Sequence, residues 1–155
     1  MIIRPAAAAD MDALYAIALA TGHAGGDASH LYSDPDLLGH IYSGPYLAVE
    51  GGFAFVAEDH EGVCGYIAGT ADTVAFAYTL ERDWWPVLRT RYGQPPAEGL
   101  TAADTRRVDM IHHPEVAPAA LTDAFPAHLH MNLLPRAQGM GLGRRLLDFA
   151  LKALA

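Results

Sequence analysis

Leu133-Leu134-Pro135-Arg136-Ala137-Gln138-Gly139-Met140-Gly141-Leu142-Gly143-Arg144-Arg145-Leu146-Leu147 joins an apolar strand to an amphipathic helix through a short turn and three alternating glycines. The first N–H groups of a helix have no intrahelical partner, and the helix dipole places partial positive charge there. Glycines let an anion approach these N–H groups closely, and Arg144 and Arg145 add positive charge. The stretch therefore predicts an anion site built largely from backbone.

The order Gln138-x-x-Gly141-x-Gly143 resembles the acetyl-CoA pyrophosphate loop of the GNAT acetyltransferases, in which an apolar-Pro step leads into Q/R-x-x-G-x-G/A. A dinucleotide loop would need G-x-G-x-x-G near the start of a βαβ unit, and a Walker loop would need Gly-Lys followed by Ser or Thr. Neither pattern is present. Taken alone, the glycines are also compatible with a helix start that packs closely on its neighbours.

The composition predicts one globular domain, with 155 residues, 52% hydrophobic and 18% charged. A net charge of −8 argues against nucleic acid or an anionic membrane as a partner. No apolar run approaches the roughly 20 residues of a membrane span, and the first residues lack the pattern of a signal peptide. Cys64 is the only cysteine, so no internal disulfide can form, and the cytoplasm is the simplest compartment.

Hydrophobic periodicity and turn residues predict an alternation of strands and helices. The strands are expected at residues 2–4, 53–58, 63–70 and 127–134, and the helices after Asp10, after Asp36 and over 142–154, with turns at Gly44-Pro45 and 59–62. This order is that of the GNAT fold. The resemblance implies an α+β domain with a mixed, mostly antiparallel central sheet flanked by helices.

Two features depart from the usual GNAT order. Residues 71–126 form a long insertion between the third and fourth strands, expected to be helical on both sides of Pro86 and to hold a capping box at Thr101-x-x-Asp104. GNAT domains also continue beyond the helix at 142–154 with a fifth strand and a helix that often supplies a Tyr acid. We therefore expect residues 1–155 to form a single GNAT-like domain whose C-terminal part is missing. The fourth strand would then have an open edge that another chain, as in a homodimer, could cover.

Further segments resemble the acetyltransferase-like C-terminal domain of O-GlcNAcase and its stand-alone bacterial relatives. They are Thr21-x-x-x-Gly25-Gly26-Asp27, Gly44-Pro45-Tyr46-Leu47, Phe55-Val56-Ala57-Glu58-Asp59, Gly62-Val63-Cys64-Gly65-Tyr66, Trp85-x-x-Leu88-x-x-x-Tyr92, His113-Pro114 and residues 127–136. Animal domains of this type look like pseudo-acetyltransferases, whereas bacterial relatives with an intact loop look able to bind acetyl-CoA. No segment resembles the hydrolase half of O-GlcNAcase, which argues against a glycosidase.

The resemblance implies an N-acetyltransferase that uses acetyl-CoA as cosubstrate and acetylates an amine of a small molecule or a protein lysine. The alternative is a catalytically inactive domain that binds acetyl-CoA or a protein partner. By the resemblance, Leu133 and Leu134 would pair with the pantetheine arm. The pyrophosphate would lie on the loop and helix start, at Gln138, Gly139, Met140, Gly141, Leu142, Gly143 and Arg144.

The fourth strand supplies the candidate base. Alternation places Leu129, Met131 and Leu133 on one face and His128, His130 and Asn132 on the other. His130 lies nearest the middle of this polar face, and imidazole titrates near neutral pH, which suits a general base. A hydrogen-bonded structural histidine is the alternative.

His113 and Asp27 are the next catalytic candidates. His113 lies in a segment that could cover the acceptor, and the alternative is a turn with solvated imidazoles. Asp27 lies where GNAT enzymes contact the acceptor, and the alternative is a helix cap or an Asx turn. His128-x-His130 has the spacing of a metal pair on a strand. Because no third ligand is evident, no metal site is predicted.

Overall fold

The computed structural model describes all residues, Met1–Ala155, and contains one four-stranded sheet in the order β1-β2-β3-β4. The strands are β1 (Ile2–Pro5), β2 (Gly52–Asp59), β3 (Gly62–Thr70) and β4 (His128–Leu133). Every neighbouring pair is antiparallel, so the expectation of a mixed sheet was wrong for these residues. The sheet contains no parallel partner because its strands follow one another as a meander. β4 pairs only with β3 and lies at an edge.

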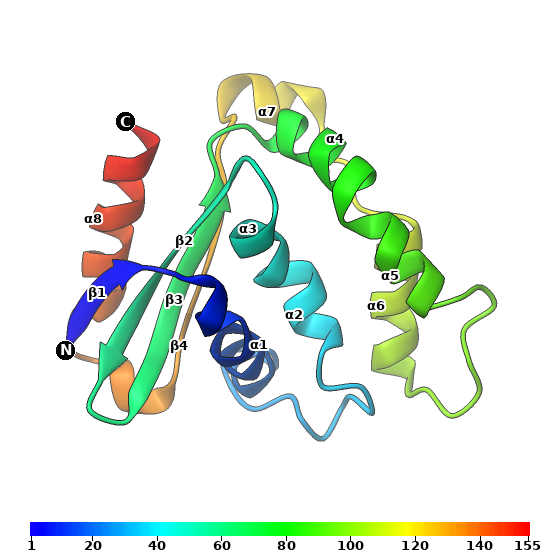
Figure 1. Ribbon diagram of the computed structural model, residues 1–155, viewed down its shortest axis with the longest axis horizontal. Coiled ribbons are helices and arrows are strands. Elements are labelled where there is room, and N and C mark those ends of the chain that lie inside the picture. The colour runs from blue at the N-terminus through cyan, green and yellow to red at the C-terminus, as the bar shows by residue number, and fades with distance from the viewer.

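Helices cover both faces of this sheet (Figure 1). On one side lies α8 (Leu142–Leu154), and on the other lie α1 (Met11–Ala20), α2 (Leu37–Tyr42) and α3 (Gly44–Ala48). The insertion supplies α4 (Thr73–Asp83), α5 (Trp85–Arg91), α6 (Ala102–His112) and α7 (Ala119–Ala124). Short 3₁₀ turns η1 (Ala8–Asp10) and η2 (Pro135–Ala137) precede α1 and α8. No helix has both the length and the apolar character that a bilayer span requires.

The core divides along the sheet. Below α8, Cys64 and Ile67 of the sheet pack with Leu142, Leu146 and Ala150, all fully or almost fully buried. The opposite face holds a second cluster, contributed by α1, α3, α4 and the sheet: Leu14, Ile17, Tyr46, Ala54, Val56, Tyr66, Ala68 and Phe76. A third cluster joins α2 to the insertion: Leu37, Trp85, Leu88, Tyr92, Val108 and Ile111. The insertion is therefore packed against the domain rather than projecting from it.

The structure differs from the sequence-based expectation at Gly44-Pro45, and it places the helical break expected near Pro86. Gly44-Pro45 was expected to be a turn, but it begins α3, with Pro45 in the first helical turn. Proline is tolerated there because its missing N–H would have no partner. The helical break in the insertion falls at Trp84, just before Pro86 in the first turn of α5, because a helix seldom continues through a proline.

Candidate functional site

The glycine loop connects the end of β4 to the start of α8. The polypeptide turns at η2, just after β4. Gly139 and Gly141 then adopt left-handed backbone conformations with φ of 75° and 70°. Residues that carry a side chain rarely adopt this backbone conformation, so both positions favour glycine. A Cβ at either position would point into open space rather than into the protein. The loop therefore presents bare backbone to a ligand.

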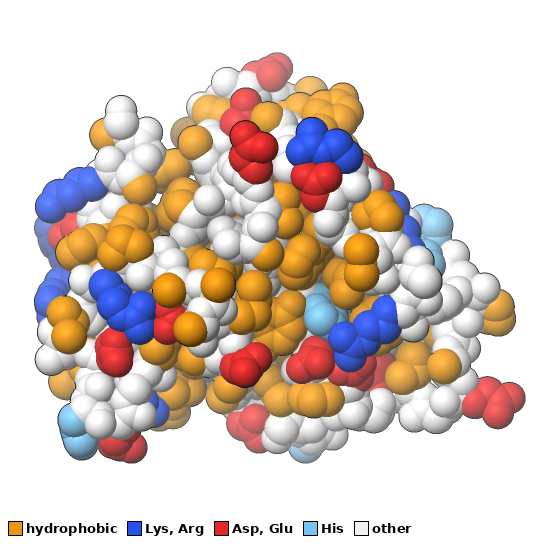
Figure 2. Space-filling view, in the orientation of Figure 1, with side chains coloured by type: hydrophobic (Ala, Val, Ile, Leu, Met, Phe, Trp, Pro, Cys, Tyr) orange, Lys and Arg blue, Asp and Glu red, His pale blue; other side chains and the backbone are white.

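Unpaired N–H groups follow directly at the start of α8. The first bond of the helix runs from Arg145 N–H to Gly141 O at 3.2 Å, and no side chain caps the helix. The N–H groups of Leu142, Gly143 and Arg144 thus have no acceptor in the chain. Arg144 and Arg145 are exposed and form no ion pair. Lys and Arg side chains gather along this edge of the molecule, beside α8 (Figure 2). The arrangement fits a pyrophosphate.

The end of β4 lies between the hydrophobic clusters on the two faces of the sheet. Leu134 packs against both clusters, and its N–H donates to Cys64 O at 2.9 Å, whereas Leu133 packs against the α8 cluster alone. Gln138 is exposed, but its side chain folds back toward the strand. Its Nε2 donates to Leu133 O at 3.0 Å and holds the loop against the strand end. Met140 remains 56% exposed at the loop tip.

The polar face of β4 is confirmed. Asn132 Nδ2 donates to Thr21 Oγ1 at the end of α1, and His128 and His130 both contact the Tyr46 hydroxyl of α3. On the other face, Leu129 and Leu133 join the α8 cluster, and Met131 Cε lies 3.5 Å from the position of a Cβ at Gly143. The two sides of the strand therefore face different layers, one aromatic and hydrogen-bonding, the other apolar.

His130 is enclosed by aromatic rings. Its centroid lies 5.4 Å from that of Tyr46 and 5.5 Å from that of Tyr42. Burial, followed by the neighbouring His128, lowers the pKa of His130 to about 4. Burial also lowers the pKa of His128. Both imidazoles are therefore neutral at pH 7, and His130 can accept a proton.

His113 and Asp27 do not join this network. His113 Nε2 lies 3.4 Å from Gln94 Nε2 in the insertion. Asp27 is exposed and accepts hydrogen bonds from the Ser29 N–H and hydroxyl, which forms an Asx turn. The Ser29 hydrogen bonds lower the pKa of Asp27. Of the three catalytic candidates, only His130 lies on the polar face of β4. No group of three His, Cys, Asp or Glu side chains is arranged to hold a metal.

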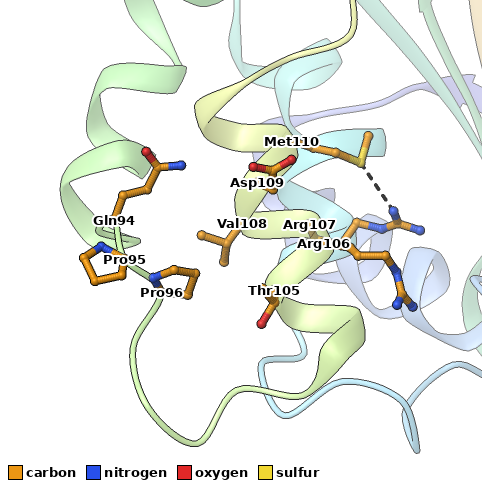
Figure 3. A pocket seen from close by; sticks show the side chains of 9 residues that line it. All are labelled: Gln94, Pro95, Pro96, Thr105, Arg106, Arg107, Val108, Asp109 and Met110. Carbon is orange, nitrogen blue, oxygen red and sulfur yellow. Dashed lines mark hydrogen bonds between the residues drawn. The ribbon is translucent and has the colours of Figure 1, made fainter.

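A hollow of about 720 Å³ lies away from β4, between residues 94–96 and α6 (Figure 3). No residue predicted for the site lines it. Arg107 on its wall donates to Met110 Sδ at 3.3 Å and lies 5.7 Å from the centre of the Tyr42 ring. Since Tyr42 also packs against His130, one aromatic ring contacts both the hollow's arginine and the polar face of β4.

Sequence reasoning missed two polar partners of the histidines, Tyr46 and Thr73. Tyr46 belongs to the segment Gly44-Pro45-Tyr46-Leu47, whose resemblance to relatives was the only signal available. Thr73, the first residue of α4, places Oγ1 2.7 Å from His128 Nδ1. No local pattern distinguishes it from any other threonine at a helix start.

Comparison with known proteins agrees with this architecture. No protein-family model matches the chain. O-GlcNAcase from Rattus norvegicus and that from Mus musculus are each 27% identical to it over 123 residues, which make up 79% of this chain and 13% of each O-GlcNAcase. The chain thus spans only a small part of these curated relatives.

A solved structure gives the stronger match. The crystal structure of SsHAT superposes with a TM-score of 0.86 at 37% sequence identity, covering 99% of this chain and 76% of SsHAT. The shared fold holds the glycine loop, β4 and the insertion within the matched length. The chain therefore belongs to the family of GNAT-like, histone-acetyltransferase-type domains that includes SsHAT and the C-terminal region of O-GlcNAcase.

Proposed function

We propose that this protein is an acetyl-CoA-dependent N-acetyltransferase that acetylates an amine, either of a small molecule or of a protein lysine. The observation that carries the proposal is the row of unpaired N–H groups at Leu142, Gly143 and Arg144 behind two left-handed glycines. Such a row favours a pyrophosphate, and the family relationship points to acetyl-CoA as its source.

Each part of the site then has a role. The start of α8 binds the pyrophosphate, and Arg144 adds charge from its exposed side chain. The open edge of β4 at Leu133 accepts the pantetheine arm, which brings the thioester toward the polar face. Acetyl-CoA supplies the acetyl group. His130 takes a proton from the acceptor nitrogen so that its electron pair can attack.

A second candidate is a domain that binds acetyl-CoA without catalysis. The observation that favours it is the pKa of His130, which burial lowers to about 4 and which makes this imidazole a weak base at neutral pH. The relationship to the C-terminal region of O-GlcNAcase is compatible with either role. Binding and turnover must therefore be measured separately.

Calorimetry with acetyl-CoA tests the binding site. We expect wild type to bind and Gly141→Val to lose binding, because valine strains the left-handed position and fills the approach to the N–H groups. Gly93→Val is the matched control, since Gly93 has no positive φ and open space around it. Circular dichroism checks that both variants fold. Unchanged affinity in Gly141→Val would contradict the proposed loop.

Release of free CoA thiol in the presence of amines tests turnover. A panel of small primary amines and lysine peptides should include at least one acceptor that raises thiol release above the rate of acetyl-CoA hydrolysis. Tight binding with no amine-dependent release from any acceptor would favour the non-catalytic alternative.

A further inference from the structure

The polar face of β4 begins a continuous chain of hydrogen bonds through four side chains from three elements. His130 Nε2 lies 3.1 Å from Tyr46 Oη, and Tyr46 Oη lies 2.7 Å from His128 Nε2. His128 Nδ1 lies 2.7 Å from Thr73 Oγ1, which in turn lies 2.7 Å from Pro126 O. The chain therefore runs from the candidate base to a backbone carbonyl.

The carbonyl end sets the direction of the whole chain. Pro126 O can only accept, so the Thr73 hydroxyl must donate its single hydrogen to it. Thr73 Oγ1 then has no hydrogen left for His128 and must accept from it. The proton of neutral His128 is thereby placed on Nδ1, and its Nε2 carries the lone pair.

The direction of the hydrogen bonds continues through Tyr46 to His130. The lone pair on His128 Nε2 requires the Tyr46 hydroxyl as donor. With its hydrogen used, Tyr46 Oη must accept from His130 Nε2–H. Neutral His130 is left with its lone pair on Nδ1. No other group of the protein hydrogen-bonds to this nitrogen. Burial raises the pKa of Tyr46 and lowers that of both histidines, so all three groups are uncharged at pH 7.

We propose that Thr73, His128 and Tyr46 are positioning residues that hold His130 in the tautomer protonated on Nε2, with Nδ1 as the atom that accepts the substrate proton. This inference rests on the proposed acetyltransferase function for its catalytic meaning. In the step, a bond forms between Nδ1 and a proton of the acceptor ammonium. The N–H bond of the ammonium breaks, and its electron pair stays on the amine nitrogen. His130 becomes an imidazolium whose Nε2–H still donates to Tyr46.

Packing holds the central tyrosine of this chain in place. The Tyr46 ring stacks on Phe76 of α4 with centroids 5.1 Å apart, and Tyr46 is only 6% exposed. The Thr73 N–H also donates to Pro126 O at 2.7 Å, which ties the start of α4 to the segment that leads into β4. Thr73, Pro126 and Tyr46 are therefore held in place by contacts in addition to the hydrogen bonds that link them to the histidines.

Nitrogen-15 NMR of the histidine rings in the wild-type protein at pH 7 tests the proposal without any acetyl transfer. We expect His128 to be protonated on Nδ1 and His130 on Nε2. Neutral histidine in water favours the proton on Nε2, so the His128 result would be specific to its contact with Thr73. Finding His128 protonated on Nε2, or His130 on Nδ1, would overturn the proposal.

Substitution of Thr73 provides the second test. In Thr73→Val, His128 loses its acceptor, so we expect its proton to move to Nε2 and donate to Tyr46. Tyr46 would then donate to His130, whose own proton would move to Nδ1. Turnover should fall about 10-fold, the scale of one lost hydrogen bond, with the KM for acetyl-CoA unchanged. Thr73→Ser should restore both the tautomers and the turnover.

Thr79→Val is the matched control, because Thr79 lies on the same helix and its hydroxyl donates to Ala75 O at an exposed position. It should retain the wild-type tautomers and turnover. If Thr73→Val kept the wild-type tautomers, the Thr73 hydroxyl would not set the direction of the hydrogen bonds, and the proposal would be wrong. If the wild-type tautomers are as expected but no amine is acetylated, the positioning network stands and the proposed acetyltransferase function fails.

Discussion

His130 combines three properties at one residue: it lies on a sheet edge, its ring is enclosed by Tyr42 and Tyr46, and burial lowers its pKa to about 4. A low pKa weakens the base but guarantees that it is unprotonated at neutral pH. Proton transfer is then favoured only if the acceptor amine is brought into the same poorly solvated space, where its own ammonium form is destabilised. The residue thus suits an acceptor that is desolvated on binding.

Replacing His130 should separate turnover from binding. We expect His130→Ala to lower kcat by about 10²–10⁴-fold, the usual contribution of a general base, with little change in acetyl-CoA affinity. His60→Ala is the control, since the His60 side chain is 89% exposed in the β2–β3 turn. Steady-state kinetics and calorimetry give the two quantities. A kcat within a few-fold of wild type would remove His130 from the mechanism and leave His113 and Asp27 as candidates.

The same residue predicts how stability depends on pH. The pKa of His130 is about 4 in the folded protein against 6.5 for a free histidine. Between these values the unfolded chain binds more protons than the folded one, so the free energy of unfolding falls as pH is lowered from 6.5 to 4. From pH 7 to pH 5 this one group should cost about 2 kcal/mol.

Urea melts at the two pH values measure the effect. The loss on acidification should be smaller in His130→Ala than in wild type by about that 2 kcal/mol, whatever the variant's absolute stability. His128 and His40, whose pKa values burial also lowers, remain in both proteins and contribute equally. Equal losses in both proteins would show that His130 is not buried in its neutral form.

At the scale of elements, Asp104 joins the insertion to the loop before α2. It lies in the first turn of α6, forms a capping box with Thr101 and accepts from Thr101 N–H at 2.8 Å. It also accepts from Ser33 N–H, at 3.1 Å to Oδ2. Burial would raise the pKa of Asp104, but the hydrogen bonds from Ser33 and Thr101 outweigh it and the net shift is downward. One carboxylate thus caps a helix and anchors a loop.

Removing this carboxylate should loosen α6 from the domain. We expect Asp104→Ala to lower the free energy of unfolding by about 2–4 kcal/mol, because several N–H groups lose their acceptor in a buried place. Asp109→Ala, on an exposed turn of the same helix, should change it by less than about 0.5 kcal/mol. Denaturant melts measure both. Equal effects of the two substitutions would contradict the anchoring role.

At the scale of the whole molecule, β4 leaves one side of the sheet without a partner strand. Met131, in the middle of β4, is 41% exposed, so the edge also presents apolar surface. An unprotected edge of this kind favours pairing with a second strand. We expect residues 1–155 to self-associate as concentration rises, with β4 as the contact.

Sedimentation velocity over a concentration series measures this association. Met131→Lys should reduce it, since a charged side chain on an edge strand disfavours strand pairing. Val116→Lys is the control, adding the same charge at a residue that is 91% exposed in the insertion. A monomer at every concentration, with no difference between the variants, would refute association through β4.

The features that could be predicted from sequence are those set by neighbouring residues. The left-handed loop follows from Gly139 and Gly141, the capping box from Thr101-x-x-Asp104, and the polar face of β4 from simple alternation. Each depends on local backbone preferences or on the period of two along a strand, which are written in a few consecutive residues. The family relationship could also be inferred, because its motifs span most of the chain.

The network around His130 could not be predicted in this way. Tyr46, Thr73 and His128 lie far apart along the chain and meet only because α3 and α4 pack on the sheet face that carries the histidines of β4. Which nitrogen of His130 is free depends on the Pro126 carbonyl, which is separated from His130 by four successive hydrogen bonds. Alternation placed His130 on the right face, but hydrogen-bond direction is a property of the assembled network, since each group's role is set by the partner that packing brings to it.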